Sequence, residues 1–280
     1  MSQNEYAKDV GELISSYPVR RRVRNLLRDT TVFFLSLSKR IDRTNNWLRF
    51  PYYHHVFDDE RKGFVRHLDY LKNYGDFISL ENAASLLESK TLIHGRYFCL
   101  TVDDGFKNCH TNIMPILVEK KISAGFFIPT MFVGKSRETG SDVYEQFFAN
   151  TGAYPLPVQF MDWDEIRSLS ESGMTIGSHT ESHQRISEMN EDSVVMELEE
   201  SKRIIESEVG ELCEHFSCPF GIPGRDFSEN MEPVWAERAG YRSFLTTRRG
   251  ANRTGDSPFF IKRENLLAYE GTHHLRYFCS

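Results

Sequence analysis

The chain has 280 residues and a formal net charge of −6, and 40% of its residues are hydrophobic, including 21 phenylalanines. This composition suffices for one large α/β domain or two small ones with a substantial core. The acidic balance gives no support to nucleic-acid binding. Five cysteines, odd in number and irregularly spaced, argue against a disulfide framework. The polar residues 1–6 lack the apolar core of a signal peptide, so we expect a cytoplasmic protein.

Residues 1–46 predict a helical N-terminal extension, because apolar residues recur at helical spacing from Val19 to Ile41. Arginines and lysines surround this stripe. Two interpretations stay open. In one, the stripe packs on the rest of the chain and the charged face is solvated. In the other, residues 19–43 lie on an anionic membrane surface.

The run Arg96–Val102 is typical of a buried strand, and it ends in Asp103, Asp104 and Gly105. Neighbouring residues of a strand point to opposite faces, so adjacent carboxylates can serve one site only where the strand ends and the chain turns. Gly105 permits such a turn. One carboxylate can then bind a metal ion while the other handles a proton. The alternative is an acidic turn, for which Asp-Gly is a common dipeptide.

A second apolar run begins at Met174 and ends in the segment 179–183, His-Thr-Glu-Ser-His. His179 and His183 are spaced i, i+4, which predicts two imidazoles on one face of a helical turn. Two histidines and one carboxylate form the ligand set of a catalytic zinc site with an open position for water. Both groups follow strands, and α/β barrels place their chemistry at strand ends. The alternative is a pair of surface histidines.

Three segments resemble the motifs of the polysaccharide deacetylase family, also described as the NodB homology domain or carbohydrate esterase family 4. The segment 101–105, Thr-Val-Asp-Asp-Gly, is similar to its first motif, and the segment 179–183 is similar to its second. The segment 217–221, Ser-Cys-Pro-Phe-Gly, is similar to its third, where Arg-x-Pro-Tyr-Gly is usual. The resemblance covers roughly residues 50 to 265. It implies an α/β fold, an irregular (β/α)7 barrel.

The predicted elements agree with that fold, because strands alternate with helices and no internal repeat is found. We expect seven strands at 48–54, 96–102, 124–130, 174–178, 214–218, 243–246 and 259–263. Helices are expected ahead of residue 75 and over 79–88, 111–121, 162–173, 190–209 and 228–239. Residues 134–158 show no regular pattern and predict a long loop. We therefore predict one barrel domain over residues 47–280 after the helical extension 1–46.

The resemblance implies roles for the acidic and histidine residues of the first two motifs. Asp104, His179 and His183 are the expected ligands of a divalent metal ion, first of all Zn²⁺, with Co²⁺, Ni²⁺ or Mn²⁺ as alternatives. Asp103 is the expected general base, which takes a proton from the attacking water. The predicted chemistry is hydrolysis of an amide.

The third motif departs from the family pattern. Ser217 stands where many relatives have the arginine that orients the base, and Arg263 at the end of the last predicted strand is the candidate replacement. Phe220 stands where tyrosine is usual, but only its backbone N–H is needed to stabilise the oxyanion. Pro219 precedes it and belongs to the same substrate-facing turn.

The general acid is left open. The late Leu-x-His motif of the family is not clearly present, and the tail carries His273 and His274 instead. His54 matches by position a histidine that many relatives hold near the active site, and His55 is its neighbour. His54 is the first candidate, with His273 and His274 as alternatives.

The predicted function is metal-dependent removal of an N-acyl group, acetyl or formyl, from an amino sugar. The expected cytoplasmic location favours a nucleotide- or lipid-linked precursor of a surface polysaccharide as the substrate, with peripheral contact to the inner membrane face through residues 19–43. The alternatives are an amidohydrolase acting on a small non-sugar amide and a non-catalytic sugar-binding relative. An intact Asp103 beside a complete ligand set speaks against the last, because a binding module needs no base.

Overall fold

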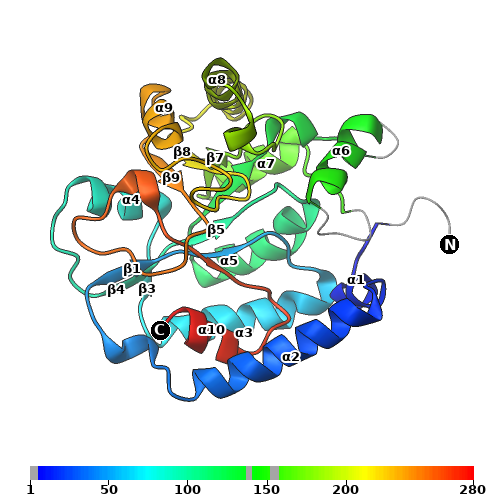
Figure 1. Cartoon of the computed structure of the whole chain (residues 1–280), viewed down its shortest axis with the longest axis vertical. Coiled ribbons are helices and arrows are strands. Elements are labelled where there is room, and N and C mark those ends of the chain that lie inside the picture. Colours follow the sequence, from blue (N-terminus) through cyan, green and yellow to red (C-terminus); the bar gives the residue numbers. More distant parts are fainter. Residues whose placement is uncertain (1–5, 137–140, 152–157) are drawn as a thin grey trace.

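The computed structural model describes residues 6–136, 141–151 and 158–280. Two parallel sheets form the centre of the described chain (Figure 1). The larger sheet has the strand order β10-β2-β5-β6-β7-β8-β9 and the smaller has the order β1-β4-β3. The strands are β1 Trp47–Arg49, β2 Pro51–Tyr53, β3 Asp76–Phe77, β4 Arg96–Phe98, β5 Leu100–Val102, β6 Ala124–Ile128, β7 Thr175–Ser178, β8 His215–Ser217, β9 Ser243–Leu245 and β10 Glu264–Asn265. This curled seven-stranded sheet confirms the predicted barrel class.

The last segment of the large sheet joins its two edges. β10 pairs with β2, and a few residues earlier Ile261 forms a parallel bridge with Leu245 of β9. The strand that we expected at 259–263 is therefore displaced. Residues Pro258–Phe260 form a 3-10 helix instead, which suits a proline with its fixed φ and missing N–H donor.

Two of the predicted strands divide between the sheets. The segment 48–54 contributes to β1 and β2, and the segment 96–102 contributes β4 and β5. Pairing continues across the division, because the Cys99 N–H donates to the Arg49 carbonyl. The second halves of both strands thereby belong to the barrel, and the residues that follow them meet at one end of the large sheet.

Helices surround the barrel (Figure 1). They are α1 Val10–Ser15, α2 Val19–Ser36, α3 Arg61–Lys72, α4 Leu80–Glu88, α5 Met114–Lys120, α6 Ser141–Thr151, α7 Trp163–Glu171, α8 Glu191–Val209, α9 Glu232–Arg238 and α10 Thr272–Phe278. Ser79 caps α4, since its hydroxyl accepts the Asn82 N–H. A π-helical turn, Cys109–Ile113, precedes α5.

The region 134–158 is not the continuous loop that we predicted, because α6 lies within it. Tyr144 and Phe147 of this helix are buried. Both rings meet the ring of Phe160, with centroids 6.0 and 5.0 Å apart. The aromatic residues that looked scattered in the sequence form one cluster beside the large sheet.

The helix α2 lies along α10 (Figure 1). Its only buried residues are Val32 and Ser36. The apolar stripe predicted for this helix faces away from the barrel, and Leu26 and Phe34 are 67% and 64% exposed. The interpretation in which the stripe packs on the barrel is therefore wrong. The division of the chain at residue 46 stays a prediction.

Candidate active site

Asp103 and Asp104 lie at the carboxyl end of β5, where the strand gives way to a tight turn. Asp104 and Gly105 have positive φ angles of 72° and 67°. A left-handed backbone is uncommon for a residue with a side chain and persists where the surrounding structure holds it in place. The turn gives the two carboxylates different partners: Asp103 contacts Arg263, and Asp104 contacts two histidines.

His179 and His183 follow β7, but not on the helical turn that their spacing predicted. The segment 179–183 is an irregular loop in which Thr180 and His183 have positive φ angles of 63° and 53°. Hydrogen bonds explain this shape. The Thr180 hydroxyl accepts the His183 N–H at 3.0 Å, and the Glu197 carboxylate of α8 accepts two further N–H groups of the loop at 2.8 Å each. The contribution of Glu197 had no signal in the sequence.

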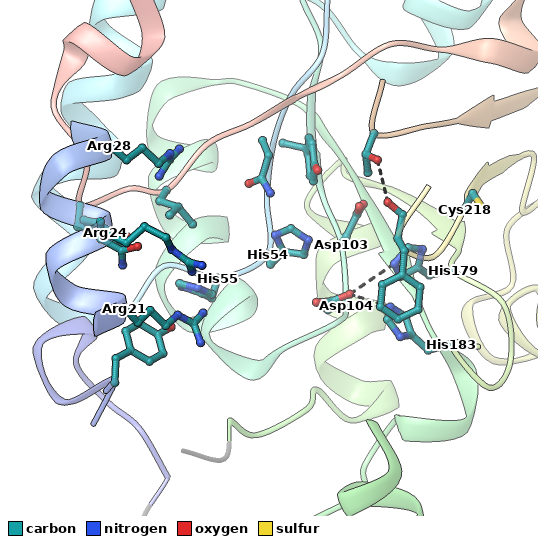
Figure 2. A pocket seen from close by; sticks show the side chains of 18 residues that line it. Arg21, Arg24, Arg28, His54, His55, Asp103, Asp104, His179, His183 and Cys218 are labelled. Atoms are coloured by element: carbon teal, nitrogen blue, oxygen red, sulfur yellow. Dashed lines mark hydrogen bonds and ion pairs between the residues drawn. The ribbon is translucent and has the colours of Figure 1, made fainter. Parts of the chain in front are cut away.

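Both imidazoles point at the Asp104 carboxylate (Figure 2). Oδ1 of Asp104 lies 3.4 Å from Nε2 of His179 and 3.3 Å from Nε2 of His183. A tetrahedral ion with ligands about 2.0–2.2 Å away keeps its ligand atoms about 3.3–3.6 Å apart. The donors are thus spaced as the ligands of one ion. Nδ1–H of His179 donates to the Ser217 carbonyl at 2.7 Å, which leaves Nε2 as the lone-pair nitrogen.

Burial and charge set the protonation of this triad, Asp104, His179 and His183. Burial acts to raise the pKa of Asp104, but the histidines around it outweigh burial and hold the pKa well below its usual value. Burial lowers the pKa of His183. It acts in the same direction on His179, where the hydrogen bond to Asp104, the charges of Asp103 and Asp104, and the hydrogen bond to Ser217 together raise the pKa overall. An ionised carboxylate and neutral imidazoles are the forms that bind metal ions.

Asp103 is held by a buried arginine from the last part of the chain. Arg263 donates from Nη1 to Oδ1 at 2.9 Å and from Nη2 to Oδ2 at 2.8 Å. Ser217 completes the group, because its hydroxyl accepts from Nη2 of Arg263 at 2.8 Å and donates to Asp103 at 3.3 Å. Burial acts to raise the pKa of Asp103, but the charge and hydrogen bonds of Arg263, together with the nearby His179 and His54, outweigh it and lower the pKa overall. The sequence pointed to Arg263 and missed the part of Ser217.

The turn after β8 brings the third motif to the same place. Phe220 and Gly221 have positive φ angles of 60° and 63°, and the Gly221 N–H donates to the Pro219 carbonyl. The Phe220 carbonyl accepts from the Thr247 hydroxyl at 2.8 Å. In the described part of the chain, the Phe220 N–H has no hydrogen-bond partner. The Phe220 ring lies 5.2 Å from that of His183, centroid to centroid.

His54 follows β2 and lies beside the two aspartates (Figure 2). Burial lowers its pKa, although Asp104 and Asp103 act in the opposite direction. The neighbouring His55 is turned toward Glu60, whose carboxylate lies 3.3 Å from its Nδ1.

The other two candidates for the general acid lie elsewhere. Nε2 of His273 and Nε2 of His274 are each 2.9 Å from the Asp29 carboxylate of α2. Neither residue lines the cavity that contains the triad. They connect α10 to α2, which leaves His54 as the candidate at the site.

The sequence model of the family described as "Polysaccharide deacetylase" matches residues 93–242. The chain belongs to the polysaccharide deacetylase family. No curated protein sequence matches the chain. Because the match begins at residue 93 and ends at residue 242, His54 and α2 precede it and Arg263 follows it.

Solved structures with the same fold are found in several bacteria. IcaB from Ammonifex degensii is 21% identical with a TM-score of 0.66, over 84% of this chain and 97% of that one. The Streptococcus pyogenes deacetylase PplD is 17% identical with a TM-score of 0.64, over 85% and 99%. The de-N-acetylase from Aggregatibacter actinomycetemcomitans is 17% identical with a TM-score of 0.65, over 83% and 100%. At these identities the similarity confirms the fold.

In this member of the polysaccharide deacetylase family, the triad opens into a cavity of about 600 Å³. Strand ends form one wall, and α2 forms the opposite wall with Arg21, Arg24 and Arg28 (Figure 2). Pro219 shapes the turn beside Phe220 but does not line the cavity. The spacing of the arginines marks one side of a helix, but nothing in the sequence showed that this side borders the active site.

Proposed function

We propose that this chain is a metal-dependent hydrolase that removes an N-acyl group, acetyl or formyl, from an amino sugar. One observation carries the proposal: the triad and a second carboxylate, Asp103, meet at one end of a cavity of about 600 Å³. A cavity of this size suits a small-molecule ligand. The family, and relatives named deacetylase and de-N-acetylase, support an amide on a sugar as the bond that is cut.

Asp104, His179 and His183 would hold the ion, because one carboxylate and two imidazoles in this spacing leave a coordination position open. Zn²⁺ fits this donor set best, and Co²⁺, Ni²⁺ or Mn²⁺ are alternatives. Such an ion, when bound, brings the pKa of a water ligand to about 7 and polarises the amide carbonyl. The Ser217 carbonyl orients His179, and the ring of Phe220 packs on His183.

Asp103 is the group that accepts the proton of the attacking water. Arg263 keeps its carboxylate ionised and fixes its orientation through two hydrogen bonds. General-base assistance of this kind is typically worth about 10²–10⁴ in rate. As water adds to the amide carbon, the carbonyl oxygen gains negative charge, which the Phe220 N–H stabilises. His54 in its protonated form gives a proton to the departing amine, and the C–N bond breaks to a free amino sugar and a carboxylic acid.

The amino sugar belongs to a nucleotide- or lipid-linked precursor of a surface polysaccharide, handled at the cytoplasmic side of the membrane. Two observations support this part of the proposal. All five cysteines are buried and unpaired, as is usual in a reducing compartment. The arginines of α2 give the cavity a cationic wall, which suits a sugar that bears phosphate better than a neutral polymer.

Metal content tests the proposal most directly. Wild type should hold about one Zn²⁺ per chain, as a single catalytic site requires, and should release acetate or formate from N-acyl amino sugars. His179→Ala should lose both properties. His94→Ala, at an exposed position, is the matched control and should keep them. No ion in wild type after reconstitution with Zn²⁺ would contradict the proposal and favour a sugar-binding relative. Turnover of non-sugar amides alone would favour an amidohydrolase.

A further inference from the structure

The outward face of α2 exposes many large apolar side chains. In the described part of the chain, 8 of the 16 exposed large hydrophobic residues lie between positions 19 and 37. Leu26 and Leu27 are 67% and 62% exposed, and Val23 and Phe34 are 50% and 64% exposed. These positions recur at the spacing of one helix face. An apolar surface of this extent marks an interaction site.

The charges of α2 indicate what covers this face. The helix has five arginines and a single acidic residue, Asp29, in a chain of net charge −6. Asp29 is engaged with His273 and His274. An apolar face bordered by cations is the pattern of a helix that lies in the interface of an anionic bilayer. A second copy of the chain would bring two such arginine borders together, and their repulsion disfavours that partner. No described helix is both long and apolar enough to cross a membrane.

The arginines also connect this face to the active site. Arg21 and Arg24 line the cavity of the triad, and the same two residues line a shallow groove on α2 with Val23 and Leu27. Figure 2 shows Arg21, Arg24 and Arg28 across the cavity from the triad, with His54 between the two groups. Arg28 is additionally paired with Glu270 at 2.7 Å. From the triad outward, the surroundings thus change from metal-binding donors to guanidinium groups and then to apolar surface.

We infer that the substrate is an N-acyl amino sugar joined through phosphate to a lipid, and that α2 binds the membrane surface which presents it. The inference rests on the proposed deacylase function and narrows its substrate. The sugar occupies the cavity, Arg21 and Arg24 bind the phosphate, and the lipid chain leaves over Val23 and Leu27. Guanidinium groups suit this task because their paired N–H donors match phosphate oxygens. A nucleotide sugar would use the arginines but would leave the apolar face without a partner.

Vesicle sedimentation tests the membrane contact. The full chain should bind vesicles of phosphatidylcholine with about one third phosphatidylglycerol more tightly than phosphatidylcholine alone. Leu26→Glu combined with Leu27→Glu should weaken binding about tenfold or more, because two leucines no longer enter the apolar region. The matched control is Leu92→Glu with Leu212→Glu, at residues that are 67% and 72% exposed outside α2, and it should bind as wild type does.

Equal binding of both double variants, or no binding by wild type, would overturn the membrane contact. The same proteins are examined for mass in solution without lipid. A dimer that becomes a monomer only in the Leu26→Glu, Leu27→Glu variant would show that a second copy covers the face, which also overturns the inference.

A comparison of three substrates distinguishes the possible sources of the phosphate. The probes are N-acetylglucosamine diphosphate joined to a short polyprenyl chain in the same vesicles, UDP-N-acetylglucosamine, and N-acetylglucosamine oligomers. Arg24→Gln should lower kcat/KM for the lipid-linked probe about tenfold more than for the oligomers, mainly through KM, because a charged hydrogen bond is lost. Arg238→Gln, exposed on α9, is the control. A higher kcat/KM for the UDP-sugar that does not depend on the presence of vesicles would overturn the lipid assignment.

The measurement with soluble oligomers distinguishes the proposed deacylase function from the inference that the substrate is lipid-linked. Release of acetate from soluble oligomers without vesicle binding leaves the deacylase function intact and removes the inference about lipid. Vesicle binding with no release from any probe, by metal-loaded protein, contradicts the deacylase function itself.

Discussion

The two walls of the active-site cavity are built in opposite ways. The wall of strand ends is buried, with Asp104, His179 and His183 no more than 4% exposed, and its backbone holds left-handed turns that hydrogen bonds stabilise. The wall formed by α2 is exposed, has few buried residues, and presents arginines and apolar side chains. The first arrangement fixes reacting groups within a narrow geometry, and the second places long guanidinium side chains across the cavity from them. Substitutions should therefore affect turnover and stability on the first wall, and the choice of substrate on the second.

The largest effect is expected at Asp103, where the buried wall does its chemistry. Asp103→Asn should lower kcat by about 10²–10⁴, the usual worth of a general base, while metal content stays as in wild type because Asp104 and the histidines are untouched. The measurement is the rate of acyl release beside metal analysis of the same sample. Asp192→Asn, exposed on α8, serves as the control. Near-normal turnover would remove Asp103 as the base.

Removing the charge of Arg263, which holds Asp103, should have the next largest effect, a loss of folding stability. Arg263→Gln leaves a buried carboxylate without its cation, and breaking a buried ion pair in this way costs about 3–5 kcal/mol. Unfolding in urea at neutral pH measures the loss, with exposed Arg238→Gln for comparison. A cost below about 1 kcal/mol, the range of surface ion pairs, would show that Asp103 does not depend on Arg263.

The buried wall could largely be predicted from the sequence, because the triad, Asp103 and Phe220 each follow a strand and belong to a short motif. The backbone conformation of these motifs could not be predicted from the sequence. The i, i+4 histidines lie on a loop and not on a helical turn, since Thr180 and Glu197 satisfy the N–H groups that a helix would otherwise pair. The last strand moved toward the C-terminus because Pro258 begins a 3-10 helix.

The α2 wall could be predicted only in part from the sequence. Periodicity predicted the helix, but the side that packs is decided by residues distant in the sequence: Asp29 meets the histidines of α10, and Arg28 meets Glu270. These polar contacts turn the apolar stripe outward, against the usual expectation that such a stripe is buried. The helix α6 was likewise not predicted, because its aromatic residues pack with partners that are distant in the sequence.

Acid should weaken the contacts that hold α2, because His67 of α3 hydrogen-bonds to Glu270, which pairs with Arg28 of α2. Nε2–H of this buried histidine donates to the Glu270 carbonyl at 2.8 Å, and Nδ1 accepts from the Tyr53 hydroxyl at 3.0 Å. Burial lowers its pKa from 6.5 to about 4. The folded state therefore binds fewer protons than the unfolded state, and stability is lost as pH falls from 6.5 toward 4, by about 3 kcal/mol.

A difference measurement isolates this histidine from the other groups that titrate in acid. His67→Gln should be less stable than wild type at pH 7, because it loses hydrogen bonds, and the gap should narrow by about 3 kcal/mol as pH falls to 4. His94→Gln, at an exposed histidine, is the control substitution. A gap for His67→Gln that stays constant with pH would show that this group does not govern the acid response.

The smallest effect is expected on the outward face of α2. Leu26→Ala should change the free energy of unfolding by no more than about 0.5 kcal/mol, as surface substitutions usually do. Leu198→Ala in α8 makes the same chemical change at a fully buried residue and should cost about 2–5 kcal/mol. Urea unfolding without lipid gives both values. A cost at Leu26 close to that at Leu198 would mean that the stripe is packed in solution, against the chain or a second copy. A negligible cost would mean that these leucines are kept for a partner and not for the fold.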